Sequence, residues 1–260
     1  MVDVATSISF NGTSLQDATY RSRLIQHTDI PQKFIQTEQK SRQDGATIVN
    51  VRYSGRVIEV QGNITGSSAA VLDQNIDALK RALRATNGTL DIAFAGTTRR
   101  YFATVQRFEI PKDYYHLTVV PYEVVFFCAD PFGYATSSGI VNITGNTGLL
   151  TEFPITVSGT IETNPVHILT INSATNCAQL NLENITTGEL IIITKASGNF
   201  AALDRVIIDS RRKQVFINGS GRDYTGTFLT IGPTQNTYRV IATADAVNYD
   251  FKLQYPPAFL

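Results

Sequence analysis

The chain has 260 residues, of which 43% are hydrophobic and 17% charged, and its 22 basic and 22 acidic residues give a formal net charge of zero. A chain of this length can bury one large core or two modest ones. Balanced charge creates no overall field that attracts nucleic acid, and it does not repel other copies of the chain. Cys128 and Cys177 are too few for a disulfide framework, and we expect two buried thiols. No apolar run is long enough to span a membrane, and the first residues lack a signal-peptide pattern, so we expect no membrane partner.

The first part of the chain predicts a long loop followed by a β-hairpin. Residues 26–45 are polar and irregular, and a loop of this length inside a domain is usually functional or disordered. Two segments with alternating apolar residues follow, 46–53 and 56–64. Only Ser54 and Gly55 separate them, a spacing typical of a tight hairpin turn.

Residues 67–87 predict the one long helix, because their apolar side chains repeat every three or four residues. Those side chains are Leu72, Ile76, Leu79 and Leu83. Ser67 or Ser68 can cap the start of the helix. Beyond it, residues 90–95 and 99–110 flank a short turn and predict a second hairpin.

The stretch PYEVVFFCADPFGY at 121–134 predicts a strand that stops abruptly at a turn. Val124, Phe126 and Cys128 alternate with Val125 and Phe127, so both faces of the strand are apolar and we expect burial on both sides. Proline cannot donate to a β-ladder, and glycine can take an unusual backbone angle. We therefore expect a structural turn, with its aromatic residues anchoring the chain, formed by Asp130, Pro131, Phe132, Gly133 and Tyr134.

The composition and the hydrophobic pattern of the sequence change after residue 134. Residues 135–151 are rich in Gly, Ser, Thr and Asn and predict a junction between domains. Residues 152–260 then show short apolar-alternating segments with turn signals about every 8–12 residues and no helical pattern, as in a β-sandwich. The predicted organisation is a domain at 1–134, the junction, and a second domain at 152–260.

Residues that could perform catalysis do not group together in the sequence. None of the histidines, His27, His116 and His167, has a partner at metal-ligand spacing, and no phosphate-binding glycine motif occurs. We therefore predict no catalytic, cofactor-binding or metal-binding residue, and a protein that is not an enzyme.

A sugar-binding β-sandwich stays open as an alternative of a different class. Such modules stack sugars on exposed aromatic rings, and the chain contains no Trp. The tyrosines that could serve are Tyr224, Tyr238, Tyr249 and Tyr255, although alternating tyrosines in strands more often pack in the core. This alternative predicts a weak glycan contact by the second domain.

Several segments together resemble the distal tail proteins (Dit) of long-tailed siphovirus bacteriophages. In the first domain, beside the 121–134 stretch, they are ISFNGTSL at 8–15, RVIEVQG at 56–62, IDALK at 76–80 and RRYFA at 99–103. The second half is similar to the C-terminal, galectin-like sandwich of tail components at 182–188, 207–210, 215–219 and 226–233. No long insertion interrupts the sandwich in this register, whereas some family members carry receptor-binding modules there.

The resemblance implies a mainly β fold, with a tail-tube-like β-sandwich or barrel and one flanking helix, followed by a galectin-like β-sandwich. It implies a homo-hexameric ring at the tail tip that joins the tail tube to the baseplate and receptor-binding apparatus. DNA would pass the ring's channel only as cargo. The protein would be made in the cytoplasm of the host bacterium and reside in the virion. A tail-tube subunit is the alternative closest to this one.

The contact between copies is expected in the first domain. The polar stretch 33–42 has no evident core role, and we predict that it forms an inter-ring or inter-subunit loop; a disordered loop is the alternative. Its charged residues are Lys33, Glu38, Lys40 and Arg42. Adjacent sheets can also extend one another at exposed edges.

Overall fold

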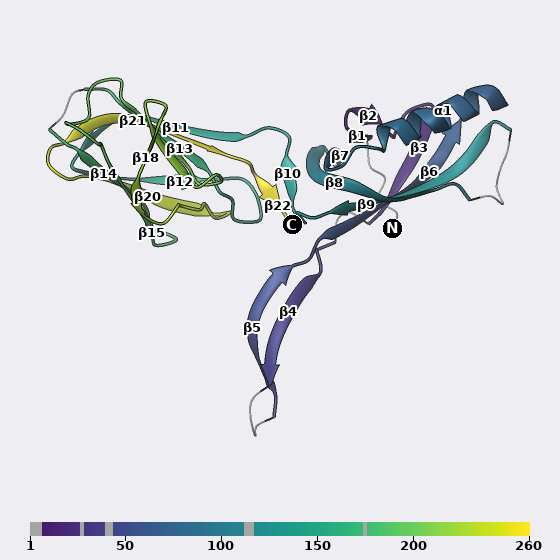
Figure 1. Cartoon of the computed structure of the whole chain (residues 1–260), viewed down its shortest axis with the longest axis horizontal. Helices are drawn as coiled ribbons and strands as arrows, with labels where there is room; N and C mark the ends of the chain where they lie inside the picture. The colour runs from purple at the N-terminus through teal and green to yellow at the C-terminus, as the bar shows by residue number, and fades with distance from the viewer. Residues whose placement is uncertain (1–6, 27–28, 40–43, 112–116, 174–175) are drawn as a thin grey trace. The chain divides into compact units, whose positions relative to one another are not determined.

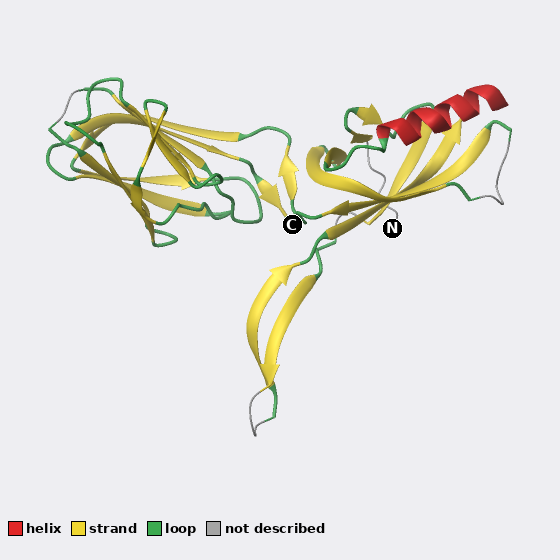
Figure 2. Ribbon diagram, in the orientation of Figure 1, coloured by secondary structure: helices red, strands yellow, loops and turns green. Residues whose placement is uncertain are grey.

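The structure is a computed structural model that describes residues 7–26, 29–39, 44–111, 117–173 and 176–260. It divides into two compact units, unit 1 at residues 1–136 with Leu260 and unit 2 at residues 137–259. Both are built mainly of strands, with one helix in the described part (Figures 1 and 2). No described helix is long and apolar enough to cross a membrane. The predicted mainly β fold is confirmed.

Unit 1 is a strongly curved sheet whose strands follow the order β2-β1-β7-β8-β9-β6-β3, with β10 beside β8. These strands are β1 (Ser7–Phe10), β2 (Thr13–Ser14), β3 (Tyr20–Gln26), β6 (Arg56–Thr65), β7 (Gly88–Phe94), β8 (Thr97–Glu109), β9 (Val119–Cys128) and β10 (Gly133–Ala135). The predicted hairpin of β7 and β8 is confirmed. Two further strands, β4 (Lys33–Gln39) and β5 (Ala46–Tyr53), pair only with each other in the described structure.

Helix α1 (Ala69–Ala82) packs on unit 1 by the apolar face that the sequence predicts, with Leu72, Ile76 and Leu79 buried. Ser68 caps it by accepting a hydrogen bond from the amide of Val71 at 3.3 Å. The helix ends earlier than expected, at the C-cap Leu83, because the chain then turns into β7.

Strand β9 lies at the centre of unit 1, between β6 and β8. Phe126 and Cys128 point into the core and are fully buried, and Val125 on the opposite face is also covered. Phe127 is 42% exposed, so the expectation that both faces of the strand are buried is wrong at this residue. The reason is that the core and α1 cover only one face of the sheet, while Phe127 rests on the backbone of Gly55.

The predicted hairpin between 46–53 and 56–64 is wrong. Strand β6 has neighbours on both sides, β3 and β9, so β5 has no free edge of β6 to join. Strand β5 pairs with β4, inside the segment expected to be a long loop. Gly55, which links β5 to β6, must be glycine because a Cβ there would lie 2.6 Å from the Phe127 ring.

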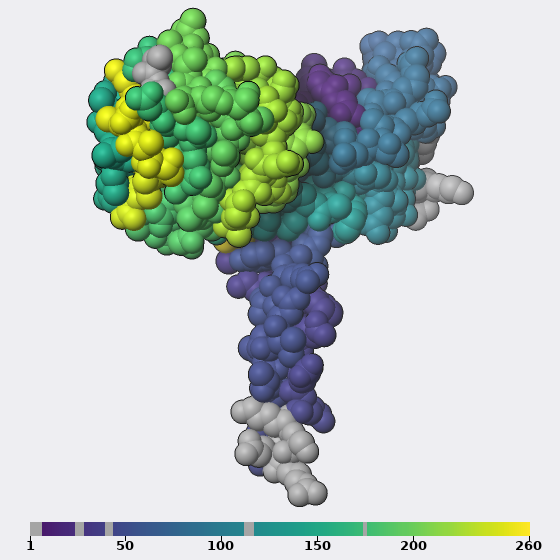
Figure 3. Space-filling view, turned by 60° about the vertical axis from the view of Figure 1, so that its left-hand side comes forward, coloured from purple at the N-terminus to yellow at the C-terminus, as the bar shows by residue number. Residues whose placement is uncertain are grey.

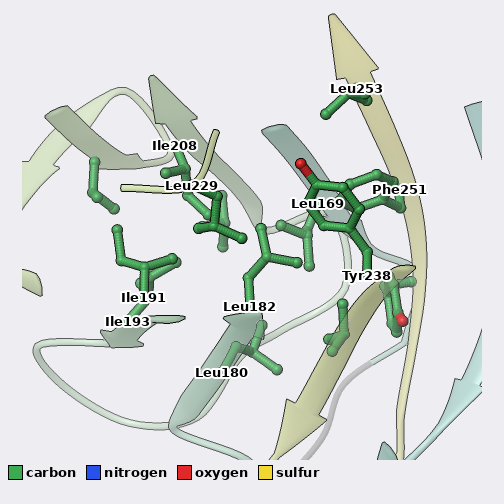
Figure 4. Packing of buried hydrophobic residues seen from close by; sticks show 14 of the residues in the cluster. Leu169, Leu180, Leu182, Ile191, Ile193, Ile208, Leu229, Tyr238, Phe251 and Leu253 are labelled. Carbon is green, nitrogen blue, oxygen red and sulfur yellow. The ribbon is translucent and has the colours of Figure 1, made fainter. Parts of the chain in front are cut away.

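Unit 2 is a sandwich of two antiparallel sheets, in the orders β11-β21-β13-β16-β17-β18 and β12-β20-β14-β15-β19. Its strands are β11 (Gly139–Gly148), β12 (Leu150–Thr156), β13 (Val166–Ile171), β14 (Gln179–Asn184), β15 (Glu189–Thr194), β16 (Arg205–Asp209), β17 (Gln214–Ile217), β18 (Ser220–Arg222), β19 (Tyr224–Gly226), β20 (Gln235–Ala242) and β21 (Val247–Tyr255), with the short β22 (Ala258–Phe259) near the end. Alternating side chains of both sheets meet in one apolar core, part of which Figure 4 shows around Leu182, Tyr238 and Phe251.

Most of the predicted junction at 135–151 is part of unit 2. Strand β11 pairs with β21, and β12 begins at Leu150 and pairs with β20. The Gly, Asn and Thr residues of β11 occupy an outer strand, where small polar side chains meet solvent. Val141 and Ile143 alternate with them and pack against the core. This alternation is typical of a strand, but the Gly- and Thr-rich composition of the segment predicted a linker.

Candidate interaction surface

Strands β4 and β5 form an antiparallel hairpin, called here the arm, that extends from the sheet of unit 1 (Figures 1 and 3). The side chains of β4 are all exposed, and most of those of β5 are too. The register pairs Lys33 with Tyr53 and Ile35 with Val51. The arm therefore has two open faces and no core of its own.

One face of the arm is apolar. Directly opposite residues of an antiparallel pair share a face, so Ile35 and Val51 lie together, and Ile48 follows opposite Thr37. Val49 is the extra residue of a bulge between the two pairs. Ile48 is 60% exposed, and the other aliphatic side chains of this group are about half exposed.

The other face of the arm is mixed. Phe34 pairs with Arg52 and is 64% exposed, and Gln36 pairs with Asn50. A two-stranded hairpin is only marginally stable in water unless it packs on something else. Contiguous exposed apolar side chains mark interaction surfaces. The apolar face of the arm thus has the properties of a surface that another protein covers.

The root of the arm is fastened to unit 1 by directed bonds. The amide and hydroxyl of Ser54 both donate to the carbonyl of Gln32 at 2.8 Å. The buried guanidinium of Arg56 donates to the carbonyl of Asp29 at 3.0 Å and to the hydroxyl of Tyr101 at 3.1 Å. These bonds hold the two chain segments that enter the arm, so its starting direction is fixed by the sheet.

The predicted turn at 130–134 meets the arm at Tyr53. The ring of Phe132 contacts the Tyr53 ring edge-on, with centroids 5.5 Å apart, and the ammonium of Lys33 lies 5.3 Å from the Tyr53 centroid. Asp130 shapes the turn by accepting from the amide of Phe132 at 3.2 Å and from the hydroxyl of Tyr134 at 2.7 Å. The structure therefore brings together two of the regions that the sequence singled out separately.

Gly133 is needed for a different reason from the one expected. It does not have a positive φ; instead, a Cβ at this position would lie 2.9 Å from the fully buried ring of Tyr101. Nearby, burial raises the pKa of the Cys128 thiol to about 12, against the opposing influence of Arg56. The thiol is therefore protonated at neutral pH.

Of the residues expected at the interface, Lys33 and Glu38 lie on β4, whereas Lys40 and Arg42 lie outside the described residues. Sequence reasoning missed the apolar members of the surface, Ile35, Ile48 and Val51. Ile48 and Val51 belong to the apolar pattern of β5, which favoured pairing with β6, whereas Ile35 lies on β4 in a mostly polar stretch that shows no strand period.

Three of the four tyrosines that could stack on a sugar are buried. Tyr238, Tyr249 and Tyr255 are buried in the core of unit 2. Tyr224 is partly exposed, and its ring packs edge-on against Phe228 with centroids 4.6 Å apart. Within the described part of the chain, no group of three or more His, Cys, Asp or Glu residues could hold a metal ion.

The comparison that decides the family concerns the second unit. A family model described as "Siphovirus-type tail component, C-terminal domain" (SPP1_Dit) matches residues 158–259. Unit 2 belongs to the Dit family of tail components. The resemblance that the sequence predicts is confirmed, and no curated protein sequence matches the chain.

Solved structures extend the likeness to the fold of the whole chain. The crystal structure of SPP1 Dit, described as a paradigm of the hub adsorption apparatus in phages that infect Gram-positive bacteria, aligns with a TM-score of 0.72 and 16% identity. The alignment covers 98% of this chain and 99% of that chain. Two structures of the phage P2 baseplate in its activated conformation, with Ca and with Sr, align at 10% identity and TM-scores of 0.46 and 0.47, covering 95% of this chain and 96% of theirs. The SPP1 Dit alignment spans both units, so the chain has the Dit fold and a Dit-family tail-component domain.

Proposed function

We propose that this Dit-family protein is a structural hub of a phage tail tip, in which copies close into a ring that joins the tail tube to the baseplate and receptor-binding apparatus. The observation that carries the proposal is the arm, which presents an apolar face without a partner in the described chain. The family of unit 2 and the likeness to SPP1 Dit support the same role. Six copies is the number that the family resemblance implies.

The arm suits a ring because the contact that it would make joins two unlike surfaces, the arm of one copy and the sheet of the next. When an arm of one copy packs on the sheet of the next, the contact is head-to-tail, and repeated head-to-tail contacts close into rings if the rotation per step allows it. Near the root, Val57 and Phe127 are exposed on the outer face of the sheet. They offer an apolar area of the same chemistry as Ile35, Ile48 and Val51, so we assign them as the receiving area on a neighbour.

The outer face of the unit 1 sheet also suits a channel through which DNA passes without binding. Cations and carboxylates alternate on it: Arg107 pairs with Glu123 and lies 3.7 Å from Glu109. Arg21 and Arg23 border the same hollow, about 560 Å³ in volume, that Glu123 lines. Mixed charge reduces the counterion-release contribution that makes a basic surface bind DNA tightly. We propose that the charged part of this face, around Arg107 and Glu123 and apart from Val57 and Phe127, lines the channel.

Electron microscopy of assembled particles tests the proposed role. A gold-labelled peptide tag placed in the exposed turn around Ala244 of unit 2 reports where the copies reside. A label at the end of the tail supports the hub. A label along the whole tail would identify a tail-tube subunit instead. Purified particles without label would show that the protein is not a component of the virion.

A further inference from the structure

Four neighbouring strands of unit 1, β3, β6, β9 and β8, carry a row of polar side chains across the outer face of the sheet (Figure 1). The register places Arg23 opposite Gln61, Gln61 opposite Glu123, and Glu123 opposite Glu109. Directly opposite residues share a face, and neighbouring strands lie about 4.8 Å apart. The backbones of Arg23 and Glu123 are therefore about 10 Å apart, which is about the screening length in salt of about 0.1 M.

The opposite charges on this part of the outer face are equal in number among the described residues. The cationic side chains are Arg21, Arg23 and Arg107, and the carboxylates are Glu59, Glu109 and Glu123. Arg21 and Arg23 are exposed, and no ion pair joins either of them to a carboxylate in the described part of the chain. Farther along β8, Arg100 is already held by both carboxylate oxygens of Asp91, at 2.7 and 2.8 Å. The charge balance therefore depends on the three glutamates.

Glu123 is held by two neighbours. One carboxylate oxygen forms an ion pair with the guanidinium of Arg107, and the other accepts from Nε2 of Gln61 at 3.0 Å. The side chain of Glu123 is 23% exposed, against 58% for Glu109, which lies 3.7 Å from Arg107. Water screens an ion pair less when the pair is partly buried. Glu123 therefore neutralises Arg107 more strongly than Glu109 does.

Without this carboxylate, the arginines would form a surface that binds DNA. Each phosphate that a cation neutralises releases counterions, and the free energy gained grows with the number of such contacts. In a ring, every copy presents the same arginines, so an excess of one positive charge per copy is repeated around the channel. DNA that binds to the wall would be slowed as it passes. Passage without binding thus requires a negative charge beside the arginines.

We propose that Glu123 is the residue that prevents this face from binding double-stranded DNA. It neutralises Arg107 directly, and its negative charge lowers the electrostatic potential beside Arg21 and Arg23. The inference rests on the channel described under the proposed function, and it names the residue on which the free passage of DNA depends.

DNA binding by the purified full-length chain tests this role. The probe is a short fluorescent DNA duplex of mixed sequence, and its anisotropy reports binding. Glu123→Gln removes the negative charge and keeps a group that can hydrogen-bond with Gln61. The affinity of this variant for the duplex should exceed that of the native chain on the order of tenfold in about 50 mM salt, and the difference should shrink as the salt concentration rises.

Glu183→Gln in unit 2 is the matched control. The side chain of Glu183 is also 23% exposed and also pairs with an arginine, Arg239, at 3.3 Å. The control changes the net charge by the same amount, so its affinity for the duplex should equal that of the native chain. Combining Glu123→Gln with Arg107→Gln restores the charge balance and should return the affinity to the native value. An affinity of Glu123→Gln no higher than native, or an equal gain in Glu183→Gln, overturns the proposal.

The folding of the variant and the location of the protein are checked separately. The thermal midpoint shows whether Glu123→Gln folds as the native chain does, and if it does not, Glu123→Thr takes its place, because threonine is neutral and favours strands. Electron microscopy of labelled particles decides the hub independently. A label away from the tail tip removes the channel whatever the DNA assay gives, whereas a label at the tip without a gain in DNA binding removes only the role of Glu123.

Discussion

His167 on β13 predicts a specific loss of stability in acid. The imidazole is fully buried in unit 2, with Nε2 3.2 Å from the hydroxyl of Tyr238, and burial lowers its pKa to about 3. In the unfolded chain the pKa of histidine is about 6.5. Below that pH the unfolded state binds a proton that the folded state excludes, so stability falls as pH falls from about 6.5 towards 3. The free energy of unfolding should drop by about 1.4 kcal/mol per pH unit, hence by about 2–3 kcal/mol between pH 6.5 and 4.5.

Urea unfolding of the native protein and of His167→Gln across this pH range isolates the effect. Glutamine cannot titrate, and it keeps a group able to hydrogen-bond with Tyr238. Carboxylates titrate in both proteins and cancel in the comparison. Asp204 is one of them: burial acts to raise its pKa, but its hydrogen-bond donors together lower it. The stability difference between the two proteins at pH 7 should shrink by about 2–3 kcal/mol at pH 4.5. Parallel pH curves would refute the reasoning.

Three further substitutions test local parts of the fold by thermal unfolding. Asp204→Ala should destabilise unit 2 by about 2–3 kcal/mol, because three donors lose their acceptor. Gly133→Ala should destabilise unit 1 by about 1–3 kcal/mol, because the new methyl group meets the buried Tyr101 ring. Ser68→Ala should destabilise unit 1 by about 1 kcal/mol, through loss of the bond that caps α1.

Each of these changes has a matched control in the chain. The controls are Asp245→Ala at an exposed aspartate, Gly221→Ala and Ser67→Ala at an exposed serine. A Cβ at Gly221 meets no atom within 4 Å. All three controls should leave the unfolding temperature equal to that of the native protein within error. Equal effects of a substitution and its control would contradict the contact assigned to that residue.

The sequence predicts elements well where the signal is local. The face of α1 is visible from Leu72, Ile76 and Leu79, and the β7–β8 hairpin from its turn residues, because neighbours in sequence make those contacts. The pairing of β6 is not visible in this way. Its partners β3 and β9 come from opposite sides of the sequence, and the short Ser54–Gly55 link favoured the wrong neighbour.

The sequence identifies only part of the arm surface, the β4 side, and it does so from polarity instead of from strand pairing. The polar character of 33–42 indicated a segment without a core role, but Lys33–Gln39 has only Phe34 and Ile35 as apolar residues and shows no strand period. The apolar side chains that dominate the arm come from β5, which sequence reasoning assigned to a core sheet. Gly133 was identified as necessary, yet the ring of Tyr101 that makes it so comes from another strand.

The mass of the protein in solution, measured by light scattering over a concentration series, tests most directly whether the arm joins copies. The native chain should move from 28.5 kDa towards six times that mass as concentration rises, and a variant with Ile35→Asn and Ile48→Asn should stay at 28.5 kDa with an unchanged unfolding temperature. A native chain that remains a monomer at every concentration, or a variant that associates as the native chain does, would contradict the account.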